Sequence, residues 1–177
     1  MSEPSRWRRS LRAAWPWLLM AGAIGLWTFG RGGPAIEEGA PAPALVVPWT
    51  GGGELDLGAR EGKVTVLAFW ATWCGACRAE GPVLSRVHER LRERGDEVIG
   101  VSVDELPLER VHDRARAYGM DYPIALASRA DTDRFQVELL PTIYVIGPDR
   151  RIAAAFTGGV GESSLMEAVE RARARSK

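Results

Sequence analysis

Cysteine and histidine are scarce in this chain, and their scarcity excludes several classes of protein. The only two cysteines, Cys74 and Cys77, are three positions apart, whereas a disulfide scaffold needs several cysteines spread along the chain. A structural zinc site needs four ligands, and the only two histidines, His88 and His112, occur in segments with the pattern of a helix surface. We therefore expect no bound metal ion.

The chain also lacks a long run of basic residues, which is the usual mark of a nucleic-acid-binding protein. Its formal net charge is zero, with 23 Lys and Arg against 23 Asp and Glu. From residue 36 onward, 18 basic side chains face 22 acidic ones, so the body of the chain is mildly acidic. Nucleic acid is accordingly not an expected partner.

The longest stretch without a charged residue covers residues 13–30, AAWPWLLMAGAIGLWTFG. Its eighteen residues are close to the minimum for a helix that crosses a bilayer. Four arginines precede it and one follows directly, which predicts that the N-terminus stays in the cytoplasm and the rest lies outside. The sequence thus predicts a cytoplasmic basic tail over residues 1–12 and a single-pass transmembrane anchor over residues 13–30.

A cleaved signal peptide is the alternative for this segment, since it has the same basic start. Such a peptide usually has a shorter apolar stretch and an A-x-A-like cleavage site, which Gly33-Pro34-Ala35 matches poorly. With either interpretation, we expect the following domain to be extracytoplasmic, in the periplasm.

The body of the chain has the pattern of one α/β domain. Residues 31–43 are rich in Gly, Pro and Ala and predict a linker, which leaves residues 44–177 for the domain. Near-continuous apolar runs predict buried strands, and apolar residues at helical spacing predict helices between and after them. The expected strands cover 63–70, 97–103, 142–146 and 151–156, and the expected helices cover 75–94, 108–118 and 161–175. This order predicts a central mixed β-sheet flanked by helices.

The two cysteines occur where a predicted strand ends and a predicted helix begins, in the segment Trp73-Cys74-Gly75-Ala76-Cys77. The unpaired N–H groups at a helix N-terminus, together with the helix dipole, stabilise a thiolate. The pattern therefore predicts a redox pair in which Cys74 attacks a disulfide and Cys77 resolves the mixed disulfide. A purely structural disulfide, or two buried thiols, is the alternative.

The stretch LAFWATWCGACRAEGP resembles the active-site segment of the thioredoxin superfamily. Together with VSVDELPLERVHDRARAYGMDYPIALAS and LLPTIYVIGPDRRI, it is most similar to the TlpA/ResA branch of membrane-anchored, extracytoplasmic proteins. The similarity covers about residues 40–172. It implies a thioredoxin-like fold and a protein thiol–disulfide oxidoreductase that needs no cofactor beyond the Cys74–Cys77 disulfide.

The resemblance also implies a substrate-binding face around Pro141, which precedes the strand TIYVI. From the residues alone, a cis and a trans proline are equally compatible with this position. In the family this proline is cis and faces the cysteine pair, so that the backbone at Leu140 pairs with an incoming peptide. The substrate-binding residues expected on this basis are Trp73, Gly75, Ala76, Leu140 and Pro141.

Glu80 is the third predicted catalytic residue. It follows Cys77 by three positions, so both lie on one helix face, and helical side chains lean toward the N-terminus. A partly buried carboxyl there has a raised pKa and can exchange a proton with Cys77, whereas a solvated acid would only favour the helix dipole. The ResA-like branch has a functional Glu at this position, and Ala68 replaces the buried acid of thioredoxin itself.

The Gly75-Ala76 pair contains no cation, which favours a reductant over a strong oxidant. The resemblance suggests disulfides of exported proteins as substrates, such as haem-binding cysteines of apocytochrome c or copper-site cysteines. Electrons would come from a membrane thiol carrier of the CcdA or DsbD kind. The alternatives are a copper-binding chaperone, which would use CxxxC and a nearby His, and a thiol peroxidase, which would have Thr in place of Ala71.

Overall fold

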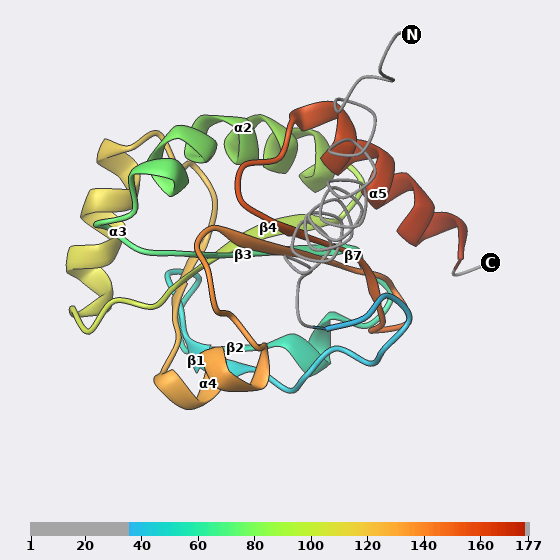
Figure 1. The fold of residues 1–177 in the computed structure, drawn as a ribbon, viewed down its shortest axis with the longest axis horizontal. Coiled ribbons are helices and arrows are strands. Elements are labelled where there is room, and N and C mark those ends of the chain that lie inside the picture. Colours follow the sequence, from blue (N-terminus) through green and yellow to red (C-terminus); the bar gives the residue numbers. More distant parts are fainter. Residues whose placement is uncertain (1–35, 176–177) are drawn as a thin grey trace, which may run out of the picture. The chain divides into compact units, whose positions relative to one another are not determined.

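The structure is a computed structural model that describes residues 36–175 (Figure 1). The predicted basic tail and the predicted anchor, residues 1–30, lie outside the described residues. Within residues 36–175, no helix combines the length and the apolar character needed to cross a membrane.

Five strands form a central mixed sheet in the order β5–β4–β3–β6–β7 (Figure 1). They are β5 (Ile124–Leu126), β4 (Glu97–Ser102), β3 (Thr65–Trp70), β6 (Thr142–Ile146) and β7 (Ile152–Thr157). Strands β3, β4 and β5 are parallel, whereas β6 pairs antiparallel with both β3 and β7. Two short strands, β1 (Val46–Pro48) and β2 (Glu54–Asp56), form a separate antiparallel pair.

The central strand β3 is buried on both faces, which explains its near-continuous apolar sequence. Val66, Ala68 and Trp70 belong to the core on one side of the sheet. Leu67 and Phe69 belong to the core on the other side. Trp70 is therefore a core residue. Strand β3 ends at Trp70, and the cysteine pair follows it at the start of α2.

Helices cover both faces of the sheet. The core on the first side contains buried residues of α2 (Gly75–Arg92), α3 (Leu108–Ala117) and α5 (Glu162–Ala174). On the opposite side lie the short helix α4 (Arg129–Arg134), the 3-10 helix η1 (Leu57–Arg60) and the β1–β2 pair (Figure 1). The predicted architecture is confirmed, with strand and helix ends within a few residues of those expected.

The described part of the predicted linker, residues 36–43, forms backbone hydrogen bonds with the start of β7. The N–H groups of Gly39 and Ala42 donate to the carbonyls of Ile152 and Arg150, each at 2.8 Å. The N–H of Ile152 donates in return to the carbonyl of Ala40 at 2.9 Å. The physical reason is that β7 is an edge strand, whose outer backbone groups need partners.

The outer strand at the opposite edge of the sheet, β5, also pairs with a segment from outside the sheet. Thr50, which follows β1, donates its N–H to the carbonyl of Ile124 in β5 at 2.8 Å. Its hydroxyl accepts the N–H of Ile124 at 3.0 Å. Trp49 forms an isolated antiparallel bridge with Ala125. Segments from outside the sheet thus pair with both of its outer strands.

Candidate active site

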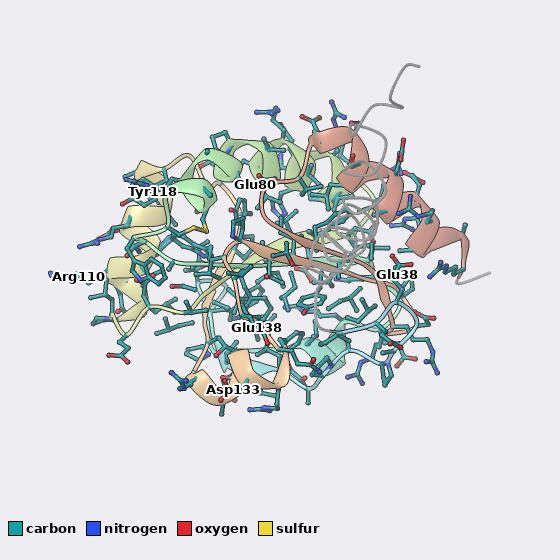
Figure 2. All side chains as sticks on the ribbon, in the orientation of Figure 1. Glu38, Glu80, Arg110, Tyr118, Asp133 and Glu138 are labelled. Atoms are coloured by element: carbon teal, nitrogen blue, oxygen red, sulfur yellow. A yellow bond between two sulfur atoms is a disulfide. The ribbon has the colours of Figure 1, made fainter. Side chains whose placement is uncertain are left out.

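Cys74 is the N-cap of α2, where the chain turns from β3 into the helix. Its Sγ accepts the backbone N–H of Cys77 at 3.1 Å. The two cysteines form a disulfide with a Cα–Cα distance of 5.3 Å. Figure 2 shows this disulfide in yellow at the start of α2 and labels Glu80 on the same helix. Both cysteines are buried, with 7% and 2% of their surfaces exposed.

This position gives Cys74 the electrostatic environment that a reactive thiol needs. The first N–H groups of α2 have no partners within the helix, and the Cys77 N–H is directed at the sulfur. A thiolate at this atom would accept a charge-assisted hydrogen bond and interact favourably with the helix dipole. The arrangement therefore suits the predicted nucleophile.

Arg78 adds a cation that the sequence analysis missed. Its Nη2 lies 3.8 Å from the position that a Cβ on Gly75 would take. Its guanidinium also lies over the ring of Tyr118, with 5.4 Å to the ring centroid. Gly75 and Ala76 themselves carry no charge, but the next turn of the helix places a positive charge beside them.

The predicted substrate-binding residues lie at the same end of the sheet. Thr142 in β6 pairs with Phe69 in β3, so Pro141 lies beside the end of β3. The Leu140–Pro141 peptide bond is cis, as predicted. Pro141 is buried and Leu140 is half-buried, whereas Trp73 is 71% exposed. Gly75 and Ala76 are also exposed.

A groove of about 670 Å³ extends from Trp73 and Leu140 toward α4. It is lined by Pro48, Trp73, Val103, Asp104, Glu105, Leu106, Leu126, Ala127, Ser128, Arg129, Thr132, Val137, Glu138 and Leu140. The exposed side chain of Leu139, 62% accessible, directly precedes Leu140. Apolar surface therefore lies next to the cysteine pair, with the acidic residues Asp104, Glu105 and Glu138 among the groove residues.

Glu80 is buried, with 7% of its surface exposed. One carboxylate oxygen accepts the N–H of Val160 at 3.1 Å, and the other lies 3.0 Å from the position of a Cβ added to Gly159. Burial raises the pKa of Glu80, and the hydrogen bond from Val160 partly offsets this rise. The predicted burial and direction of the pKa shift are confirmed, whereas its exchange of a proton with Cys77 stays a prediction.

Tyr122 is a neighbour of Glu80 that the sequence analysis did not identify. Burial raises the pKa of its phenol, and the negative charge of Glu80 raises this pKa further. Gly100 makes room for this packing, because an added Cβ there would lie 2.9 Å from Tyr122 Cε2 and 3.2 Å from Trp70 Nε1. Only the tertiary fold brings Tyr122 to α2, so local sequence carried no signal for it.

Comparison with known proteins gives consistent relatives. The model of the AhpC/TSA family matches residues 39–155. The thiol-disulfide oxidoreductase ResA of Bacillus subtilis (strain 168) is 33% identical over 135 residues, which cover 76% of this chain and 75% of that protein.

Solved structures share the fold. A candidate DsbE thiol:disulfide interchange protein from Chlorobium tepidum has a TM-score of 0.71 at 21% identity, over 78% of this chain and 99% of its own. A DsbF homologue from Corynebacterium diphtheriae has a TM-score of 0.67 at 25% identity, over 76% of this chain and 89% of its own.

The residues matched by the family model include Cys74, Cys77, Glu80 and Pro141. The match to the family model covers more than half of the chain, and the alignment with the Bacillus subtilis relative covers three quarters of it. The central mixed sheet with helices on both faces is the fold that the solved relatives share. The chain therefore belongs to the AhpC/TSA family and is a ResA-like thiol–disulfide oxidoreductase with a thioredoxin-like fold.

Proposed function

We propose that this domain reduces disulfides in exported proteins, with Cys74 as the nucleophile and Cys77 as the resolving thiol. The observation that carries the proposal is the N-cap position of Cys74, whose Sγ accepts the N–H of Cys77. A hydrogen bond and a helix dipole aimed at one sulfur favour its thiolate over that of the other cysteine.

The reaction has two steps. The Cys74 thiolate attacks one sulfur of the substrate disulfide, a mixed disulfide forms, and the other substrate sulfur leaves as a thiolate. Cys77 then loses its proton and attacks Cys74 Sγ, which closes the Cys74–Cys77 disulfide and releases the second substrate thiolate. Two electrons pass from the dithiol to the substrate, which is reduced while the domain is oxidised.

We propose that Glu80 takes the Cys77 proton in the second step. It lies one helical turn from Cys77 and is buried, and its raised pKa makes the carboxylate a stronger base than an exposed glutamate. Because Ala68 on β3 cannot ionise, Glu80 provides the nearby acid–base group on α2.

The substrate would bind across Trp73, Gly75, Ala76, Leu140 and Pro141. Leu140 precedes β6 and lines the groove together with Trp73. An extended peptide could pair with the backbone at Leu140. The side chain of the residue adjacent to the peptide's cysteine would then lie in the groove. The exposed indole of Trp73 offers a flat apolar contact beside the sulfur atoms.

We further propose that residues 13–30 anchor the chain in a membrane as a single-pass helix and that the domain lies on the periplasmic side. Substrates would be disulfides of apocytochrome c or of copper sites. A CcdA- or DsbD-type membrane carrier would then reduce the Cys74–Cys77 disulfide back to the dithiol. The basic residues before the apolar run support this orientation. A reduction potential close to that of strong oxidants would contradict the reducing direction.

A Cys77→Ala variant tests the proposal. Without the resolving thiol, Cys74 should retain its partner as a mixed disulfide that mass spectrometry can identify. The control is Cys74→Ala, which should trap much less of the same partner. Equal trapping by the two variants would contradict the assignment of Cys74 as the nucleophile.

A further inference from the structure

Two buried aspartates bind backbone N–H groups at opposite ends of the β3–β4 strand pair. Asp96, before β4, accepts the N–H of Val64 at 2.8 Å. Asp104, after β4, accepts the N–H of Thr72 at 2.8 Å. Each bond joins residues 32 positions apart, and the two aspartates are 3% and 7% exposed. The end that contains Asp104 is the end that leads to the cysteine pair.

Asp104 makes more hydrogen bonds than this one. Its Oδ1 accepts the hydroxyl of Thr72 at 2.8 Å, and its Oδ2 accepts the hydroxyl of Ser102 at 2.7 Å. The N–H of Asp104 donates in turn to the Ser102 hydroxyl oxygen at 3.1 Å. All three contacts to the carboxylate are hydrogen bonds donated by Thr72 and Ser102.

Helix α3 fixes Thr72 from another direction. The hydroxyl of Tyr118, at the C-terminal end of α3, donates to the carbonyl of Thr72 at 3.4 Å. Arg114 Nη1 lies 3.5 Å from the Thr72 hydroxyl oxygen. The N–H, hydroxyl and carbonyl of Thr72 thus all have partners, and only 4% of this residue is exposed. The exposed Trp73 and the redox sulfur of Cys74 follow immediately.

We propose that Asp104 is a positioning residue for disulfide exchange, which acts on Cys74 by holding Thr72 at the end of β3. Thr72 is two residues before Cys74, and the N–H of Cys74 donates to the carbonyl of Ala71 at 3.1 Å, so this short turn transmits any shift of Thr72 to the sulfur. Nucleophilic attack on a disulfide requires close alignment of three sulfur atoms, so small displacements slow it strongly. The inference rests on the proposed nucleophilic role of Cys74.

The charge of Asp104 also affects the stability of the Cys74 thiolate. Two residues span at most about 7 Å, so the carboxylate lies within about 10 Å of the Cys74 backbone. A buried negative charge at that range opposes a thiolate, which acts against the helix dipole. Other charged or titratable groups on the surrounding elements include Arg78, Glu80, Glu105, Arg114, Tyr118, Tyr122, Arg129 and Glu138. Asp104→Asn removes one negative charge and leaves these groups in place.

Two measurements test the inference on the full-length protein. The pH profile of Cys74 alkylation by iodoacetamide, in the reduced Cys77→Ala background, reports the charge effect. In this background, Asp104→Asn should move the alkylation midpoint at least about half a pH unit lower. The plateau rate with an oxidised Cys-X-X-Cys-His peptide, measured with Cys77 present, reports the alignment and should fall at least about tenfold.

Asp96→Asn is the matched control, because it weakens the same kind of bond at the other end of the same strand pair. It should lower stability and leave both the alkylation midpoint and the plateau rate at the parent values. Identical values for Asp104→Asn and Asp96→Asn would overturn the inference.

Thr72→Val keeps the test available if Asp104→Asn does not fold, since it removes only the two hydroxyl contacts, to Asp104 and Arg114, and keeps the backbone N–H bond. It should slow the plateau rate, and adding Asp104→Asn should slow it by less than the product of the two single effects. If the double variant slowed the plateau rate by the full product of the two single effects, Asp104 would not act through Thr72. A parent protein that does not exchange with the peptide would refute the proposed function, whereas the alkylation midpoints would still decide the role of Asp104.

Discussion

The N–H of Val160 donates to the carboxylate of Glu80 at 3.1 Å and joins the loop before α5 to the helix that carries both cysteines. Gly159 lies against the other oxygen of the same carboxylate. A glycine at position 159 thus has a structural role, because a side chain there would crowd the buried Glu80 carboxylate. The Val160–Glu80 hydrogen bond thus joins Glu80, which we propose to transfer a proton, to the loop before α5.

The first prediction concerns the removal of the Glu80 charge. Glu80→Gln should slow exchange with a peptide disulfide at least about tenfold across pH 6–8, because Cys77 loses its proton acceptor. Stopped-flow measurement of the second step would check this, and equal rates for variant and parent would remove Glu80 from the mechanism.

The same variant has a defined effect on stability. The pKa of folded Glu80 lies above its ordinary value of 4.5, so the folded protein holds this proton more tightly than the unfolded chain. The contribution of Glu80 to the free energy of unfolding is therefore greatest below pH 4.5 and falls as the pH rises through the folded pKa. Urea titrations should show that Glu80→Gln removes this fall, so stability at pH 7 should be at least that of the parent.

The second prediction concerns the contact with Gly159. Gly159→Ala should displace the Glu80 carboxylate, because the new Cβ would lie 3.0 Å from Oε2. We expect slower exchange and a loss of about 1 kcal/mol or more in the free energy of unfolding. Gly161→Ser is the control, since an added Cβ there meets no atom within 4 Å. Similar losses in the two variants would contradict a specific contact.

The third prediction concerns His88, whose Nδ1 accepts the N–H of Val98 in β4 at 3.1 Å. Burial lowers the pKa of His88, and Arg92 lowers it further. Below the ordinary value of 6.5, the unfolded chain binds a proton that the folded protein resists. The free energy of unfolding should therefore decrease as the pH falls from 6.5 toward the lower folded pKa.

Urea titrations between pH 5 and 8 would check this slope. His88→Gln should reduce the slope below pH 6.5, whereas His112→Gln, on α3, should leave it in place. An unchanged slope in His88→Gln would assign the effect to other groups.

The fourth prediction concerns the apolar surface beside the disulfide. Trp73→Ala and Leu139→Ser should each raise KM for a peptide substrate several-fold with little change in stability, because both side chains are largely exposed. Val46→Ser is the matched control, since Val46 is an exposed apolar residue on β1 outside the groove. An equal change in KM for Val46→Ser would indicate a nonspecific effect of surface hydrophobicity.

Local patterns in the sequence were sufficient for the architecture and for the cysteine pair. The apolar run of β3 reflects burial on both faces, and Leu84, Val87 and Leu91 fall at helical spacing on the buried side of α2. Cys74 could be placed at the N-terminus of α2 because a strand pattern changes to a helix pattern there. The position of the cis-proline came from family resemblance rather than from any local physical pattern.

Contacts between distant segments could not be predicted in this way. The bond from Thr72 to Asp104 spans 32 positions and depends on the register of β3 against β4. Glycine and proline made residues 36–43 resemble a linker, although their backbone pairs with β7. Arg78 was not identified, because its position over Tyr118 depends on how α2 packs against α3.

The pairing of both outer strands with flanking segments has a consequence for self-association. The segment with Gly39 and Ala42 pairs with the backbone at the start of β7, and Thr50 pairs with Ile124 at the start of β5. A second copy of the domain therefore finds the backbone groups at these positions already paired, which disfavours edge-to-edge association there. Such pairing limits the addition of another strand at these positions while the oxidoreductase binds a protein disulfide.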